Sequence, residues 1–596
     1  MEKKVLKRSE VNQQETWDLT RLFKTEADYN GAMAQIEELA DKFAANYKGK
    51  LTTSEIINKA LDDYREVDTL CSHVYCYANL HVESDQTNEE NVLRAGNMEN
   101  VLANFDKKVV FFTAEINTVD ETILKEAADK SPANRRYITE VIKNLKHKLD
   151  PAVEIAMAEL SQVLEAPYAN YGKFKFADMT FDSFEVNGKT HEQSFTLFEN
   201  GWACELDTDI RRAAFENFYT KLGQYENGLA NNYQTQVLAE KAIANLRKFE
   251  TVFDYLLHEQ DVSVEFYDRQ IDLIMEHLAK PMRKYANLIK ETHKLDKLTY
   301  ADLHLDIDPG FSPTVTVAKS RQFSIDSLAI LGAEYKELIE EAFDERWIDF
   351  PQSIGRSTGG FCSSPYGKGS FILLNWSNQM REVLTLAHEL GHAGHFYYAH
   401  KHQNAFDGDC SLYFAEAPST MNEIILVDHL KNQSTDPRLQ RYVLSTMVSK
   451  TYYHNCVTHL LEAHFQREVY RRVERQEPIT AKVLNGLMLD TIKKFWGDTV
   501  EVPDYAGRTW MRQPHYFIGL YPYTYSAGLT IATAAFAKIK RGELPVERWL
   551  DMLKAGGTKS PVELALMADV DLSTEAPLME MINYISGMID EIATLS

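Results

Sequence analysis

Cysteine is scarce in this chain of 596 residues, and its six cysteines are scattered along the sequence. No two of them form a CxxC pair, and a chain of this length can build its core without disulfides. The charged residues at the start are followed by Ser, Glu, Asn and Gln rather than by the apolar block of a secretion signal. We therefore expect reduced thiols and a cytoplasmic protein.

Lys and Arg are also fewer than Asp and Glu. The chain has 64 Lys and Arg against 88 Asp and Glu, which gives a formal net charge of −24. Such a charge repels phosphate backbones and anionic lipids, and the sequence shows no basic patch to offset it. The one long uncharged stretch, 518–537, contains a proline, three tyrosines and several Ser and Thr, so we expect it to be buried in protein. The sequence thus predicts binding neither to nucleic acid nor to membranes.

Internal repeats, low-complexity runs and Pro- or Ser-rich linkers are absent as well. Over residues 26–173, apolar residues recur at spacings of three and four, which is typical of successive amphipathic helices. Around 174–198 the period changes towards two, and Asn187-Gly188 is a type I′ turn signal for a hairpin. We predict an N-terminal helical region with a short β-hairpin over residues 1–205, and a second domain over residues 206–596.

A second β-like segment lies at 355–376, where several glycines precede the apolar run 370–376. In an otherwise helical chain, this segment predicts a small β-sheet. The edge of that sheet could bind an extended peptide by strand addition, or the sheet could be a structural hairpin that covers the core. The sequence leaves both interpretations open.

The motif HExxH follows directly, at residues 388–392 of a predicted amphipathic helix. Two histidines four residues apart lie one turn apart on a helix, where both rings can bind one Zn²⁺ at about 2.0–2.1 Å. Glu389 is rotated by about 100° from His388, so it can reach the open coordination position without binding the ion. The motif predicts His388 and His392 as zinc ligands and Glu389 as the general base.

A catalytic zinc needs a third protein ligand. The metzincin pattern would place glycine and histidine where His395 and Tyr398 stand, which excludes that class and leaves His395 as a candidate contact to the ligands or the substrate. The thermolysin pattern would place a glutamate where Leu412 stands. The nearest carboxylate beyond is Glu416, which we predict as the third ligand. Glu423 would share its helical face, and it either accepts a hydrogen bond from a zinc-bound histidine or is a solvated carboxylate.

These residues resemble the M3 family of zinc oligopeptidases, and within it the oligoendopeptidase F group. The match consists of HExxH, the segment Glu-Ala-Pro-Ser at 416–419, the glycine-rich strand before the motif, and a tyrosine-rich segment at 512–525. It covers most of the chain. The resemblance implies a mainly α fold, prolate and multi-helical, with a deep internal channel, one Zn²⁺ per chain, and endopeptidase action on short peptides.

The tyrosine-rich segment contains the candidates for a donor to the substrate oxyanion. A tetrahedral intermediate needs such a donor besides the metal. By position, the resemblance implies His515 and Tyr523 as catalytic residues, with Tyr521 and Tyr525 as weaker candidates. The segment departs from the family pattern at 518–519, where an aromatic residue is common, so the identity of the donor stays open at this point.

The sequence therefore predicts a zinc-dependent endopeptidase that hydrolyses internal bonds of short, unstructured peptides. One alternative is a channelled zinc carboxypeptidase, which would need a cationic group for the substrate C-terminus, and Arg508 and Arg512 are available for it. The other alternative is a non-catalytic peptide-binding protein. Such a protein would have no need of the general base Glu389.

Overall fold

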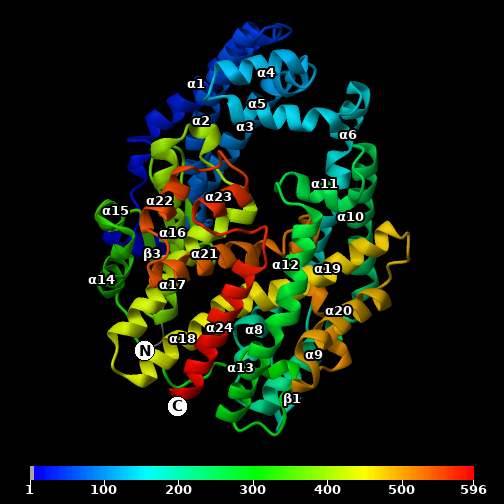
Figure 1. The fold of residues 1–596 in the computed structure, drawn as a ribbon, viewed down its shortest axis with the longest axis vertical. Coiled ribbons are helices and arrows are strands. Elements are labelled where there is room, and N and C mark those ends of the chain that lie inside the picture. Colours follow the sequence, from blue (N-terminus) through cyan, green and yellow to red (C-terminus); the bar gives the residue numbers. More distant parts are fainter. Residues whose placement is uncertain (1–5, 596) are drawn as a thin grey trace.

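The computed structural model describes residues 6–595 and consists almost entirely of helices in an elongated body, as the sequence predicts (Figure 1). The N-terminal helices are long because their apolar residues recur on one face, and Thr25, Thr53 and Asn88 cap the first three. These helices are α1 (Glu26–Tyr47), α2 (Ser54–Ser84), α3 (Glu89–Ile116), α4 (Glu121–Lys130), α5 (Arg135–Asn144), α6 (Pro151–Leu164) and α7 (Ala166–Lys173).

The predicted hairpin is confirmed. Strand β1 (Phe184–Val186) pairs antiparallel with β2 (Lys189–His191). Between them, Asn187 and Gly188 have φ angles of 53° and 73°, as a type I′ turn requires.

The rest of the chain is again helical. Helices α16 (Met380–His402), α17 (Leu412–Gln433) and α21 (Thr524–Arg541) lie at its centre (Figure 1). Around them are α8 (Phe195–Asn200), α9 (Thr208–Leu222), α10 (Glu226–Leu246), α11 (Val252–His258), α12 (Val264–His277), α13 (Ala279–Thr292), α14 (Val317–Leu328), α15 (Ala333–Asp344), α18 (Pro437–Thr446), α19 (His459–Glu474), α20 (Ala481–Trp496), α22 (Val546–Lys554), α23 (Pro561–Met567) and α24 (Ala576–Thr594).

The predicted small sheet lies against α16. Its strand order is β3 (Ile348–Pro351), β5 (Phe371–Trp376), β4 (Phe361–Ser363), with β3 parallel and β4 antiparallel to the central β5. Successive side chains of a strand point to opposite faces. Accordingly, Phe371 and Leu373 pack into an apolar core made by the N-terminal helices, whereas Ile372 and Leu374 pack into the larger core of the rest of the chain. The sheet therefore joins the two cores.

The division between these cores falls between Ile138 and Tyr171. The boundary between regions 1–205 and 206–596 stays a prediction.

Two glycines allow α17 to pack closely between α16 and α21. A Cβ atom on Gly391 of α16 would lie 2.5 Å from the carbonyl oxygen of Pro418, and a Cβ atom on Gly528 of α21 would lie 2.7 Å from the backbone of Glu416. Both distances are shorter than van der Waals contact. Only glycine permits these helices to approach so closely, which brings the Glu416 turn beside the HExxH motif.

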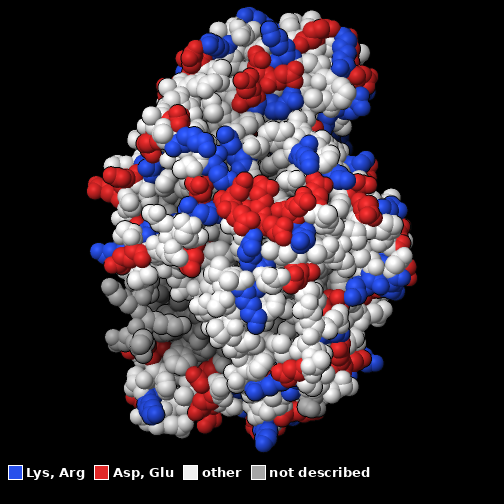
Figure 2. Space-filling model, turned by 90° about the vertical axis from the view of Figure 1, so that its left-hand side faces the viewer, with Lys and Arg blue, Asp and Glu red and all other residues white. Residues whose placement is uncertain are grey.

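The stretch 518–537 is largely buried inside the protein, as expected, and most of it forms α21. Among residues 6–595, no helix combines the length and apolar character needed to cross a bilayer. The surface agrees with the net charge of −24, since acidic side chains form the largest single-sign group on the face in Figure 2.

We expect Gly391→Ala to lower both stability and metal retention. The added methyl group would collide with the α17 backbone, and overpacking of this kind costs about 1–3 kcal/mol. It would also push Glu416 away from the histidines. Thermal unfolding and metal content after dialysis measure the two effects.

Gly96→Ala in α3 is the matched control, because a Cβ atom there meets nothing within 4 Å. It should leave metal content unchanged and stabilise the helix slightly. Equal behaviour of the two variants would contradict the role given to Gly391.

Candidate metal centre

The structure brings the three predicted metal ligands together. The Nε2 atoms of His388 and His392 lie 3.3 and 3.5 Å from Oε2 of Glu416. Four ligands around one zinc ion, each at about 2.0–2.1 Å, lie about 3.3–3.4 Å from one another in a tetrahedron. The spacing and the donor set of two imidazoles and one carboxylate therefore fit a single zinc ion.

The segment Glu-Ala-Pro-Ser fixes the Glu416 carboxylate. Pro418 lies inside α17, where it has no N–H to donate to the preceding turn. Ser419 Oγ donates to Glu416 Oε2 at 2.7 Å, and Thr420 Oγ1 donates to the Glu416 carbonyl oxygen at 2.6 Å. These hydroxyls hold the carboxylate in the orientation that faces the two histidines.

Glu423 determines which nitrogen of His388 is free. Its Oε1 accepts a hydrogen bond of 2.7 Å from His388 Nδ1, and its Oε2 accepts one from Thr451. Because a carboxylate only accepts, Nδ1 carries the proton and Nε2 presents a lone pair to the ligand cluster. Burial lowers the pKa of His388, but the hydrogen bonds to Glu416 and Glu423 outweigh burial and raise it well above its usual value. The surroundings therefore favour a positive charge at this point.

Glu389 has the environment of a general base. Its side chain is 5% exposed, and burial raises the pKa of its carboxyl above the usual range despite the opposing effect of His388 and His392. A Cβ atom on Gly360, just before β4, would lie 3.4 Å from Glu389 Oε1, so the sheet passes close to this carboxylate. Glu389 therefore binds a proton more readily than an exposed glutamate does, as a general base that must hold and return a proton requires.

These groups line a cavity of about 350 Å³. Its wall includes His388, Glu389 and Glu416 together with Tyr525. The remaining lining residues are Arg381, Leu384, Thr385, Thr420, Glu423, Thr446, Lys450, Thr451, His454 and Asn455.

The tyrosine-rich segment meets this cavity through Tyr525. The Tyr525 hydroxyl lies 3.4 Å from Nε2 of His515, and the Tyr521 ring lies 5.1 Å from the Tyr525 ring. Burial and Tyr521 raise the pKa of Tyr525, so its phenol keeps its proton. His515, Tyr521 and Tyr525 are thus grouped beside the candidate metal centre.

Tyr523 lies elsewhere. Its side chain is fully buried, its hydroxyl donates to Gln260 at 2.5 Å, and its ring packs against Tyr267 and Tyr413. Alternate residues at the start of a helix point in different directions, and the backbone here turns Tyr525 rather than Tyr523 into the cavity. The expectation that Tyr523 reaches the substrate is therefore corrected in favour of Tyr525.

His395 also lies outside the cavity wall. It is 1% exposed and packs against Phe396 and Phe414, and burial lowers the pKa of its ring to about 3. His395 lies three residues after His392, and its ring packs in the apolar core rather than on the cavity wall. The expectation that His395 contacts the ligands or the substrate is corrected by this position.

Sequence reasoning missed part of the cavity wall. Two π-helical stretches, Met447–Tyr452 and His454–Thr458, place Thr451 and His454 in the cavity, and Glu462 of α19 lies behind them. π-Helical turns inside helices are frequent at functional sites. The only signal in the sequence was the run His454, His459, Glu462, His464, in which three histidines and a glutamate occur within eleven residues.

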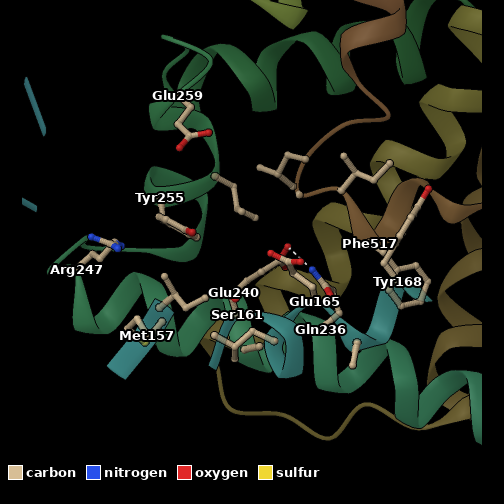
Figure 3. Close-up of a pocket in the computed structure, with 18 of the residues that line it drawn as sticks. Met157, Ser161, Glu165, Tyr168, Gln236, Glu240, Arg247, Tyr255, Glu259 and Phe517 are labelled. Atoms are coloured by element: carbon tan, nitrogen blue, oxygen red, sulfur yellow. Dashed lines mark hydrogen bonds between the residues drawn. The ribbon is translucent and has the colours of Figure 1, made fainter. Parts of the chain in front are cut away.

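A second, larger cavity of about 1340 Å³ lies between α6, α7, α10 and α11 (Figure 3). Residues 517–520 of the tyrosine-rich segment and Leu412 at the start of α17 also line it. Figure 3 shows Glu165, Glu240 and Glu259 around the space, with Glu240 accepting a hydrogen bond of 2.9 Å from Gln236. Two cavities thus border the tyrosine-rich segment, the larger through residues 517–520 and the smaller through Tyr525.

Comparison with known proteins gives consistent matches. The sequence pattern of Peptidase family M3 matches residues 204–584, and a pattern described as Oligopeptidase F matches residues 115–181. Oligopeptidase PepF of Bacillus subtilis is 28% identical, with 99% of this chain and 88% of that protein covered. An oligoendopeptidase F homolog of Borreliella burgdorferi is 26% identical, with 99% of both covered.

Solved structures show the same fold. A putative peptidase from Chlamydophila abortus superposes with a TM-score of 0.90 over 100% of both chains at 21% identity. Oligoendopeptidase F from Enterococcus faecium superposes with a TM-score of 0.72 at 21% identity, with 96% of this chain and 99% of that chain covered.

We expect Glu416→Ala to abolish metal retention and Glu423→Gln to weaken it about 10–100-fold. The first change removes a ligand, whereas the second removes only the acceptor that orients His388. Zinc content after dialysis against a graded series of chelator concentrations measures both. Retention by Glu416→Ala equal to that of the unaltered protein would exclude Glu416 as a ligand.

Proposed function

Because the chain belongs to peptidase family M3 and is therefore a metallo-oligopeptidase, we propose that it binds one Zn²⁺ through His388, His392 and Glu416. Its substrates in this proposal are short, unstructured peptides, which it cleaves at internal bonds. The observation that carries the proposal is the convergence of the three ligand atoms at 3.3 and 3.5 Å beside the buried Glu389.

The chemistry divides between the metal and the protein. When bound, a zinc ion supplies a Lewis acid that polarises the scissile carbonyl and makes water more acidic. Glu389 removes the proton from the attacking water, and its raised pKa lets it keep that proton and then deliver it to the leaving amine. Tyr525 donates a hydrogen bond to the oxygen on which negative charge develops, and His515 holds the Tyr525 hydroxyl beside it.

The geometry of the site favours flexible peptides as substrates. Two of the ligands, His388 and Glu416, line a cavity of about 350 Å³, which admits a few side chains but no folded domain. Strand β4 is an outer strand of its sheet and contacts α16. We place an extended peptide along β4, where backbone hydrogen bonds bind any sequence and bring the scissile bond towards Glu389.

A carboxypeptidase would need a cationic group that is free to bind the substrate C-terminus. Arg508 pairs with Glu226 at 2.9 Å, and Arg512 pairs with Glu199 at 3.0 Å. Both guanidinium groups, the candidates for that role, are thus neutralised within the protein. Neither arginine therefore supports a carboxypeptidase.

We further propose that the protein works in a reducing cytoplasm. All six cysteines are free thiols, and Cys71, Cys76 and Cys456 are buried.

Glu389→Gln should keep zinc and lose at least about a thousandfold in kcat, because the general base and its proton delivery are both removed. Hydrolysis of an internally quenched peptide, with zinc content measured on the same sample, gives both quantities. In the unaltered protein, a chelator should abolish cleavage and added zinc should restore it. Full activity of Glu389→Gln would remove Glu389 from the mechanism.

Tyr525→Phe should lower kcat about a hundredfold, as expected for the loss of one oxyanion donor. Tyr523→Phe is the matched control, since its hydroxyl bonds Gln260 outside the cavity. It should keep kcat and lose about 1 kcal/mol of stability. The opposite ranking of the two variants would return the donor role to Tyr523.

A further inference from the structure

Five polar side chains form a continuous network behind the tyrosine-rich segment. At its centre is Glu462 of α19, whose side chain is 3% exposed. Glu462 Oε2 lies 2.8 Å from Nδ1 of His459 and 3.1 Å from Nδ1 of His515. Nε2 of His459 lies 3.1 Å from Nε2 of His454, and Nε2 of His515 lies 3.4 Å from the Tyr525 hydroxyl. Both ends of the network, His454 and Tyr525, line the metal cavity.

The separations identify hydrogen bonds rather than a second metal site. The ligand atoms of His459, Glu462 and His515 lie within 4.8 Å of one another, as those of a metal site would. Ligands that share one zinc ion lie about 3.3 Å apart, which is the spacing found at His388 and Glu416. Distances of 2.8 and 3.1 Å are instead those of direct N–H···O bonds.

The carboxylate fixes the protons on three rings. Burial raises the pKa of Glu462, but the charges and hydrogen bonds of His459 and His515 outweigh burial and lower it to about 2, so the group is ionised. An ionised carboxylate only accepts, so both neighbouring Nδ1 atoms carry protons. In a ring that carries its one proton on Nδ1, Nε2 is an acceptor, so Nε2 of His459 can accept from His454 and Nε2 of His515 can accept from Tyr525.

We propose that Glu462 is a positioning residue for hydrolysis, acting through His515 on Tyr525. Glu462 holds the His515 ring so that Nε2 faces the Tyr525 hydroxyl, and the His459 ring stacks on Tyr525 at 3.9 Å from the other side. The bond from Tyr525 to His515 is long, so the hydroxyl can turn to the substrate while the ring stays in place. This inference rests on the proposed function, in which His515 and Tyr525 serve the oxyanion.

The test compares Glu462→Gln with Glu474→Gln in the zinc-loaded full-length protein. Glu474 lies on the same helix and accepts from Lys241 and the Val252 N–H, away from the cavity. Glu462→Gln should lower kcat about 10–100-fold with one zinc per chain retained. Its KM should change by less than about threefold, because only the transition state uses the aligned donors. Glu474→Gln should match the unaltered protein.

A double-variant cycle separates positioning from a general structural role. If Glu462 acts through His515, adding Glu462→Gln to His515→Ala should change kcat by less than about twofold. If Glu462→Gln does not fold, Glu462→Asp replaces it in the cycle, because it keeps the charge but moves the oxygens away from both rings. Its loss of kcat should likewise vanish in the His515→Ala background.

Three results would overturn the inference. The first is an unchanged kcat in Glu462→Gln or in the Glu462→Asp variant that replaces it, while His515→Ala is impaired. The second is a loss that multiplies with that of His515→Ala. The third is a second zinc equivalent that disappears with Glu462→Gln, which would make the cluster a metal site. Absence of zinc-dependent cleavage by the unaltered protein would instead refute the proposed function, and this inference with it.

Discussion

The close approach of α16 and α17 is the constraint on which the candidate site depends. Two ligands come from one helix and the third from the other, so the distance between the helix axes sets the distance between the ligand atoms. Gly391 has no side chain to separate these helices, and Gly528 likewise allows α21 to pack closely against α17. The site is therefore a property of backbone packing as much as of the ligands. A shift of α17 by the width of a methyl group would carry Glu416 away from the two histidines, because a close-packed core leaves little room for its side chain to compensate.

Three glutamates near the cavity differ because their neighbours differ. Glu389 has burial as its largest influence, so its pKa is raised and it suits proton transfer. Burial also acts on Glu416 and Glu462, but two histidines at each of them lower the pKa below the usual range. The same side chain thus supplies a base, a ligand and a hydrogen-bond acceptor, and hydrogen bonds from the adjacent imidazoles, present at Glu416 and Glu462 but not at Glu389, decide the direction of the pKa shift.

The sequence predicted whatever follows from local spacing. The HExxH register follows from the helical period, the hairpin from the Asn187-Gly188 turn signal, and the strand at 370–376 from its apolar run after several glycines, and the structure contains all three. Glu416 was found by excluding other spacings. Tyr523 and His395 lie outside the cavity wall, because neither order along the chain nor helical spacing says which of several neighbouring side chains enters a cavity. Glu462 was missed because its importance depends on His515, 53 residues away, and on two π-helical turns that no simple periodicity reveals.

The negative charge of the chain and its buried imidazoles both influence the charge balance at the candidate metal centre. A negative surface favours approach of cations, and three carboxylates near the cavity stabilise positive charge within it. Hydrolysis also develops negative charge on the substrate, which these carboxylates oppose. Neutral donors such as the Tyr525 hydroxyl, placed on the cavity wall and kept protonated by burial, counter that repulsion. Glu462, which the His515 ring separates from the cavity, can therefore position the donors while its negative charge stays at a distance from the oxyanion.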